Sequence, residues 1–178
     1  MTNGQEKDNA VTEVAITGGY AGDGDRLWKN ELLGPASSQC DLPVLPQKRH
    51  GHVTFTTSDK TKSLITCGGY GEGGKRSCLV LNTQTKEWKT MSDLLQDRIF
   101  SSVVSMPDAV VILGGVKDQE TSSEYLLSGS DEWKAGPDLK GKGAYGSCAV
   151  TISKTSLLLI GGWNDRNQVR ELDTYRPV

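Results

Sequence analysis

The sequence predicts an all-β fold assembled from a repeated unit of short antiparallel strands. Glycine makes up 21 of the 178 residues, well above its usual share of about 7%. The apolar runs are only four or five residues long, which suits strands better than helices. A pair of adjacent glycines recurs at nearly even spacing along the chain. Evenly spaced short strands with periodic glycines are typical of all-β repeat folds.

Each glycine pair directly follows an apolar run. The runs VAIT, LITC, VVIL and LLLI are rich in β-branched residues and leucine, which favour buried strands. Glycine tolerates positive φ and the close approach of another backbone, so a strand can end sharply there. We therefore interpret eight glycines as structural: Gly18, Gly19, Gly68, Gly69, Gly114, Gly115, Gly161 and Gly162.

The residues between the glycine pairs repeat in phase with them. Trp88 lies nineteen residues after Gly69, and Trp133 lies eighteen residues after Gly115. Each tryptophan follows a strand-like segment and a polar turn, and its large apolar surface can fill the space between neighbouring sheets. A leucine and a basic residue then introduce the next unit, at Leu45 and Arg49, Leu94 and Arg98, and Leu139 and Lys142.

This period divides the chain into a polar tail, 1–10, and four units. The units span approximately 11–46, 47–93, 94–139 and 140–178. Strands are expected at 12–17, 26–33 and 38–42; at 51–57, 62–67, 77–82 and 86–90; at 100–105, 109–113, 123–127 and 131–134; and at 145–152, 156–160 and 168–175. The first unit lacks an obvious first strand, and the fourth unit lacks its tryptophan strand.

A period of this length with an apolar strand, a glycine pair and a later tryptophan resembles the kelch repeat. The resemblance covers residues 11–178, and it is specific because several features recur in phase. It implies a kelch-type β-propeller with four-stranded antiparallel blades, of which this chain supplies three to four repeats. Because propeller rings contain about four to eight blades, we expect an incomplete propeller or a fragment of a longer protein. The alternatives are pairing with another chain to complete the ring, and closure as a small four-bladed ring.

Two cysteines, Cys67 and Cys78, flank a glycine-rich turn and are expected to end the two strands of one hairpin. Residues directly opposite across a hairpin are close enough for a disulfide, and this segment resembles extracellular kelch proteins, in which such a bridge is expected. The alternative is two free buried cysteines. Cys40 and Cys148 fall in different units and are not expected to pair with each other. The cysteine pattern favours an extracellular location; a cytoplasmic one is the alternative, and residues 1–10 show no secretory signal.

The sequence argues against several other chemistries. The segment from Gly69 to Ser77 approaches a phosphate-binding loop, but Arg76 stands where the magnesium-binding hydroxyl belongs and a strand follows instead of a helix. With no C-x-x-C and only two histidines, we expect no metal site. A net charge of −2 with no basic block gives no nucleic-acid surface, and no apolar run approaches the roughly 20 residues of a membrane span. We expect no cofactor and no catalytic residue.

Aromatic and basic residues on the expected turns form a candidate binding surface. Arginine and aromatic residues are favoured at binding hot spots. The set comprises Tyr20, Arg49, His50, Tyr70, Arg98, Tyr145 and Trp163. The alternative is that these residues pack between the blades. His50 and His52 are alternate residues that would share one face of a strand. Their role would be either hydrogen bonding at the blade end, or ligand binding or proton transfer.

Together these expectations indicate a non-catalytic interaction module that binds another protein, or alternatively a glycan, through the loops between its strands. Function resides in such loops rather than in the fold itself. One alternative is a fragment of an enzyme similar to the galactose-oxidase-like kelch proteins, with its active site in missing blades. This chain has no cluster of tyrosines and histidines to match that site. The other alternative is a structural repeat domain that requires a partner chain.

Overall fold

The regular secondary structure of the described residues consists entirely of β-strands. The computed structural model describes residues 14–20, 26–33, 42–56, 63–116, 121–139, 145–163 and 172–175. Within these residues every strand pairing is antiparallel. The all-β prediction is therefore confirmed. Most of the strand expected at 38–42 lies outside the described residues.

Two four-stranded antiparallel sheets form the centre of the molecule. The first consists of β4 (Val53–Thr56), β5 (Leu64–Cys67), β7 (Cys78–Asn82) and β8 (Glu87–Met91). The second consists of β9 (Ser102–Ser105), β10 (Ala109–Leu113), β11 (Ser123–Leu127) and β12 (Trp133–Ala135). In both sheets the strands pair in their order along the chain, because a short turn can join neighbouring antiparallel strands.

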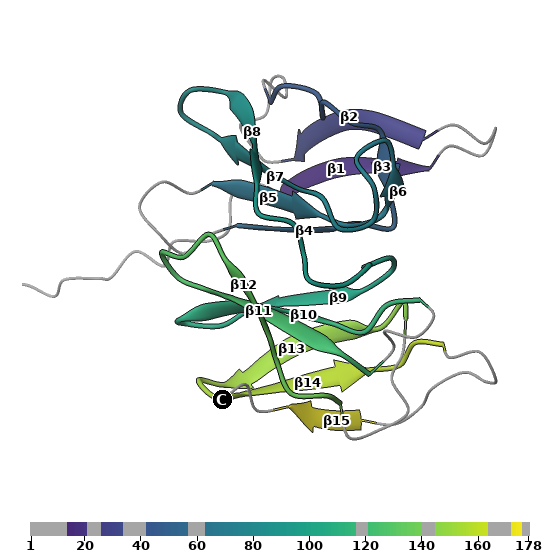
Figure 1. Ribbon diagram of the computed structural model, residues 1–178, viewed down its shortest axis with the longest axis vertical. Coiled ribbons are helices and arrows are strands. Elements are labelled where there is room, and N and C mark those ends of the chain that lie inside the picture. Colours follow the sequence, from purple (N-terminus) through teal and green to yellow (C-terminus); the bar gives the residue numbers. More distant parts are fainter. Residues whose placement is uncertain are drawn as a thin grey trace, which may run out of the picture.

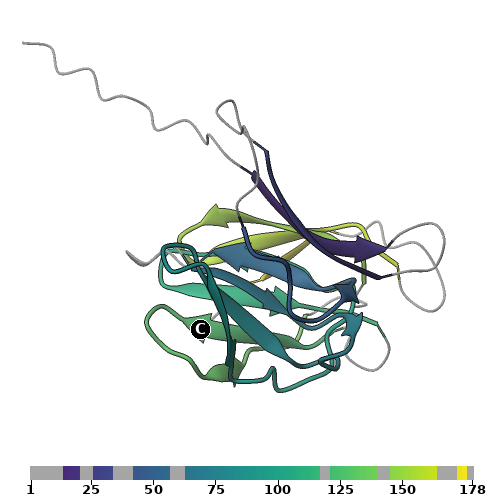
Figure 2. The same ribbon diagram turned by 90° about the horizontal axis from the view of Figure 1, so that it is seen from above.

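Smaller sheets flank this central pair. One contains β1 (Val14–Tyr20) and β2 (Arg26–Leu33), and the other contains β13 (Cys148–Ser153), β14 (Ser156–Ile160) and β15 (Leu172–Tyr175). Figure 1 shows the sheets following one another along the long axis, from β1 and β2 at the top to β15 at the bottom. Figure 2 looks along that axis, so the sheets overlap in the view.

A short strand pairing that the sequence did not predict lies at one end of the sheets. β3 (Arg49–His50) pairs with β6 (Tyr70–Gly71), to the right in Figure 1. Gly71 permits this pairing, because a Cβ there would lie 2.2 Å from the carbonyl oxygen of Lys48. The pairing brings the start of the second unit next to the turn that follows its glycine pair.

Apolar side chains from facing sheets fill the spaces between them. The cluster between the two four-stranded sheets contains Val53, Phe55, Ile65, Cys67, Cys78, Leu94, Val110, Ile112, Leu126 and Trp133. The cluster between the second of these sheets and β13–β15 contains Val104, Met106, Val111, Leu113, Leu139, Leu157 and Leu159. The ring of Trp133 meets that of Phe55 edge-on at 6.2 Å. Trp88 is partly buried, and its indole N–H donates to the carbonyl oxygen of Pro43 at 3.1 Å.

Arg49 links two strands of the first four-stranded sheet by hydrogen bonds. Its Nη1 donates to the carbonyl oxygens of Gly68, at 3.2 Å, and Ser77, at 3.1 Å. Its Nη2 donates to the hydroxyl of Ser77 at 3.0 Å and to the side-chain oxygen of Gln47. Gly68 follows β5 and Ser77 precedes β7, so one buried guanidinium bridges the end of one strand and the start of the next.

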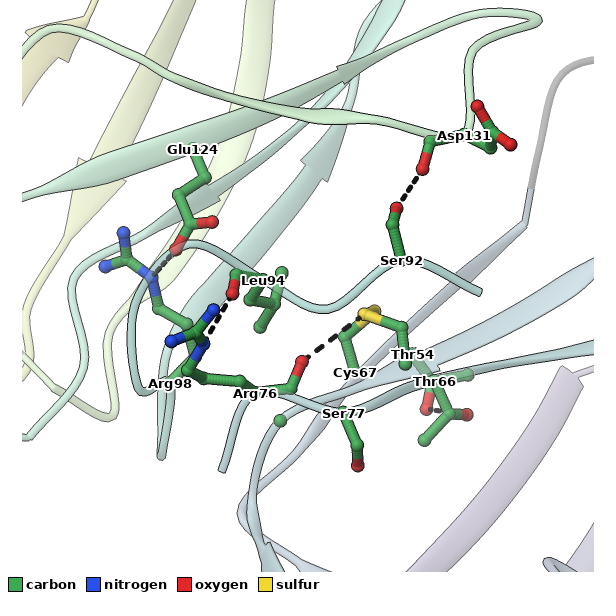
Figure 3. Close-up of a disulfide and its surroundings, with 12 residues drawn as sticks. Thr54, Thr66, Cys67, Arg76, Ser77, Ser92, Leu94, Arg98, Glu124 and Asp131 are labelled. Atoms are coloured by element: carbon green, nitrogen blue, oxygen red, sulfur yellow. Dashed lines mark hydrogen bonds and ion pairs between the residues drawn. A yellow bond between two sulfur atoms is a disulfide. The ribbon is translucent and has the colours of Figure 1, made fainter. Parts of the chain in front are cut away.

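Arg98 makes the corresponding bridge in the second four-stranded sheet. Its Nη1 donates to the carbonyl oxygens of Gly114, at 2.7 Å, and Ser122, at 3.0 Å. Its Nε also donates to the carboxylate of Glu124 at 2.8 Å, and both side chains are only 1% exposed. The same carboxylate accepts the backbone N–H of Leu95 at 2.6 Å. This ion pair therefore ties β11 to the segment that enters the third unit, as Figure 3 shows.

Cys67 and Cys78 form a disulfide, which confirms the bridged alternative. They lie directly opposite each other on β5 and β7, with sulfur atoms 2.06 Å apart, and Figure 3 shows their surroundings. Both residues are buried within the apolar cluster between the four-stranded sheets. Closing a loop this short stabilises the fold by about 3 kcal/mol in the chain-entropy account. Among the described residues Cys148 is a free cysteine and is exposed; Cys40 lies outside them.

The glycine pairs let successive units approach closely. All eight of these glycines have positive φ, with values of 71° at Gly68 and 84° at Gly69. The N–H of Gly69 donates to the carbonyl oxygen of Arg98 at 2.7 Å. A Cβ on Gly68 would lie only 2.4 Å from that same oxygen. The second and third units thus meet backbone to backbone, at a position where no side chain fits.

We expect Gly68→Ala to destabilise the fold far more than Gly129→Ala. Gly129 has a similar φ of 79°, but a Cβ there meets nothing within 4 Å, so its alanine variant bears only backbone strain of about 1–2 kcal/mol. Gly68→Ala adds the clash with Arg98 and should lose about 3 kcal/mol or more in total. Urea denaturation of both variants gives the comparison. Equal losses would show that the close approach is not required.

Candidate binding surface

An aromatic cluster, defined as Tyr20, His50, Tyr70 and Phe100, lies on the surface. It is found at the end of the sheets where β3 pairs with β6. The centre of the His50 ring lies 5.1 Å from that of Tyr20, 5.6 Å from that of Tyr70 and 6.2 Å from that of Phe100. The His50 and Tyr70 rings are stacked. These distances are typical of favourable aromatic pairs. Side chains from three successive units therefore meet at one place.

The backbone places these rings together through the glycine pairs and the β3–β6 pairing. Tyr20 and Tyr70 each directly follow a glycine pair. His50 is directly opposite Tyr70 in the pairing of β3 with β6. Because residues directly opposite in an antiparallel pair project to the same face, the two rings stack. The glycine pairs therefore determine where the aromatic residues emerge from the fold.

Phe100 is a member of the cluster that the sequence analysis did not identify. Its φ of 55° is rare for a bulky residue. Its N–H donates to the carbonyl oxygen of Gly51 at 2.7 Å, and a Cβ on Gly51 would lie 2.8 Å from the Phe100 ring. Backbone strain of this kind persists where the surroundings fix it, and it is concentrated at functional sites. The available signal was its position two residues after Arg98, which matches that of Gly51 after Arg49.

Three rings of the cluster are exposed to solvent. Tyr20 is 60% exposed, Phe100 42% and Tyr70 38%, and neighbouring exposed rings of this size are characteristic of interaction sites. Charged groups adjoin them, since the Lys75 ammonium lies 5.5 Å from the centre of the Tyr70 ring and 3.5 Å from the Asp97 carboxylate. The surface therefore has an aromatic centre with an ammonium and a carboxylate beside it.

A second pair of aromatic residues, Tyr145 and Trp163, lies in the fourth unit. The backbone N–H of each donates to the carbonyl oxygen of the other at 2.9 Å, and Trp163 is 54% exposed. The N–H of Gly146 donates to the carbonyl oxygen of Phe100 at 2.7 Å. This bond links the second pair directly to the aromatic cluster.

Arg49 and Arg98 do not lie on this surface, so the expectation that they are exposed on the rim is wrong. Each is only 1% exposed, because its guanidinium is directed inward to the carbonyl oxygen of the first glycine of a pair. Both arginines act as positioning residues for the cluster. His50 directly follows Arg49, and Phe100 comes two residues after Arg98.

His52 has a different partner from His50, which belongs to the aromatic cluster. Gly51 has a φ of 64° and separates β3 from β4, so the strand alternation is broken between them. The Nε2 of His52 is hydrogen-bonded to the hydroxyl of Thr17 at 3.1 Å, which links β1 to the first four-stranded sheet. Burial, with a contribution from the charge of Arg49, lowers the pKa of His52 to about 4. The imidazole is therefore neutral at physiological pH and holds two sheets together.

No cation site or membrane-spanning helix is found in the described part of the chain. Its histidine, cysteine and acidic side chains do not gather in groups of three or more that could hold a metal ion. It also contains no helix of the length and apolar character needed to cross a membrane. A comparison with protein-family models and with curated proteins finds no match for this chain.

The low pKa of His52 predicts a loss of stability in mild acid. The pKa rises from about 4 in the folded state to about 6.5 on unfolding, so protonation favours the unfolded chain. The contribution of His52 is constant above pH 6.5 and falls as the pH drops towards 4, by at most about 1.4 kcal/mol per pH unit. We expect the free energy of unfolding, measured by urea denaturation across this range, to have a shallower slope against pH for His52→Gln than for the wild type. Identical slopes would contradict the assignment.

Proposed function

We propose that this chain is part of a kelch-type β-propeller and serves as a non-catalytic module that binds another protein through its aromatic cluster. The propeller assignment is supported by two successive four-stranded antiparallel sheets in phase with the glycine pairs. It is supported further by Trp133, which packs one such sheet against the preceding one. These are the features in which the sequence resembles the kelch repeat.

The observation that carries the binding proposal is the aromatic cluster itself. Its rings come from three successive units and are held by strand pairing and by the Phe100–Gly51 hydrogen bond. Binding to rings that are already fixed orders few side chains, which reduces the entropy lost on association. Such a surface is suited to protein recognition.

The chemistry of the surface indicates what kind of partner fits it. An apolar or aromatic side chain of the partner would pack on the exposed faces of Tyr20, Tyr70 and Phe100. Polar groups around that side chain would meet Lys75 and Asp97 at the margin. We propose a protein loop with an apolar tip as the bound element, because it combines both features.

The disulfide supports a location outside the reducing cytosol. The Cys67–Cys78 bridge joins neighbouring strands within the buried core, and structural disulfides persist in oxidising compartments. We therefore propose that the module works in an extracellular or otherwise oxidising environment, where its partner would also be found.

The test is affinity capture from an extracellular protein extract of the source organism, with quantitative mass spectrometry. The wild-type chain is compared with the double variant Tyr20→Ala and Tyr70→Ala, which removes the two exposed tyrosine rings. A matched control, Val44→Ala with Leu127→Ala, removes two exposed apolar side chains elsewhere. We expect a protein retained by the wild type and the control but weakened about tenfold or more by the tyrosine variant.

Two results would count against this function. Retention of the same proteins by all three chains, with unchanged circular dichroism, would show that the cluster is not the binding surface. Loss of binding after enzymatic removal of glycans from the captured partner would instead assign the cluster to glycan recognition, for which its exposed rings also provide stacking faces.

A further inference from the structure

The sheet β13–β15 has an apolar face that no other described element covers. Val150 is 39% exposed, Ile152 54% and Ile160 42%. The other face of this sheet is buried, with Leu157 and Leu159 packed against the second four-stranded sheet. One face of the sheet therefore takes part in the stack, and the opposite face exposes branched apolar side chains to solvent.

The corresponding positions in the two preceding sheets are buried against a neighbouring sheet. Ile160 directly precedes a glycine pair, as do Cys67 and Leu113, which are both fully buried. Val150 matches Val104 in the strand register, and Val104 is buried in the cluster between two sheets. The exposed face thus has the residue pattern that, in the two preceding sheets, packs against the next sheet.

The sequence carries the matching half of such an interface in its first unit. In the third and fourth units, the residues four and two positions before the glycine pair pack against the preceding sheet: Val110 and Ile112 in the third, Leu157 and Leu159 in the fourth. Val14 and Ile16 occupy those two positions before Gly18. The first unit therefore has the residue types that would meet an apolar face of this kind.

We propose that the exposed face of β13 and β14 packs against the β1–β2 sheet of a second copy of this chain. Figure 1 shows these two sheets at opposite ends of the stack, so they do not cover each other within one chain. In a closed ring of two copies each exposed face meets a β1–β2 sheet, and each contact repeats the packing that already joins successive units. Head-to-tail contacts of this type close into a ring when the rotation between copies permits it.

The first experiment measures the mass of the full chain by light scattering over a range of concentrations. We expect twice the chain mass of 19.2 kDa. Ile152→Lys places a charge on the proposed interface and should raise the dimer dissociation constant at least about 30-fold. The control is Leu127→Lys, on β11, where a side chain of similar exposure lies away from this face. Circular dichroism shows that each variant retains its strands.

The second experiment tests the head-to-tail orientation by complementation. Ile16→Lys should weaken the dimer as Ile152→Lys does, because it charges the other half of the contact. Mixing these two variants leaves one intact contact, between the β13–β14 face of Ile16→Lys and the β1–β2 sheet of Ile152→Lys. We therefore expect the mixture to form dimers at concentrations where each variant alone is monomeric.

Protection of Cys148 gives an independent measurement. Its side chain is exposed, and it pairs with Ile160 in the register of β13 and β14. In a Cys40→Ser background, maleimide labelling of Cys148 should slow about tenfold when the concentration passes from below to well above the dissociation constant. A rate independent of concentration would contradict dimerisation through this face.

Three further outcomes would overturn the proposal. A folded monomer at every concentration would show that a second copy is not the occupant and that the face is covered by another protein segment. A dimer insensitive to Ile152→Lys would place the contact elsewhere. A dimer sensitive to Ile152→Lys but not to Ile16→Lys would join two β13–β14 faces to each other instead of head to tail.

Discussion

The rest of the structure depends on a buried guanidinium that donates to two carbonyl oxygens, one on the first glycine of a pair and one on the serine that precedes the next strand. Arg49 and Arg98 each bridge the second and third strands of a four-stranded sheet. The carbonyl oxygen of Arg98 in turn accepts the N–H of Gly69 in the preceding unit. One residue therefore fixes both the strands within a sheet and the approach of one unit to the next. His50 directly follows Arg49 and Phe100 comes two residues after Arg98, so the positions of these two rings depend on the arginines.

The two sheets stabilise this buried charge in different ways. Burial lowers the pKa of both arginines, which reflects the cost of taking a guanidinium out of water. Arg98 is compensated by the carboxylate of Glu124, whereas Arg49 bonds the neutral side chains of Gln47 and Ser77. What the sheets share is the pair of hydrogen bonds from the arginine to two carbonyl oxygens. These bonds, rather than an ion pair, are the common element of the repeat.

The strands, the glycine pairs and the disulfide could be predicted from the sequence because they depend on local pattern and on periodicity. The burial of Arg49 could not, since arginine is usually exposed and the carbonyl oxygens it bonds belong to residues 19 and 28 positions away. The membership of Phe100 in the aromatic cluster could not be predicted for a similar reason. Its left-handed backbone is set by a bond to Gly51 in another unit. Residue types therefore identify the repeat and three rings of the cluster, whereas contacts between units are needed to add Phe100 and to place the two arginines in the interior.

The stability and hydrogen exchange of Arg98→Lys test this account most directly. Lysine keeps the charge beside Glu124 but lacks the planar fork that reaches two carbonyl oxygens and the carboxylate together. We expect a loss of about 3 kcal/mol, with faster amide exchange around Gly114 and Phe100. Arg76→Lys is the matched control, since Arg76 is exposed and its Nε donates to the carbonyl oxygen of Leu94; it should lose less than about 1 kcal/mol. Equal stability and unchanged exchange for the two variants would contradict the central role of the buried guanidinium.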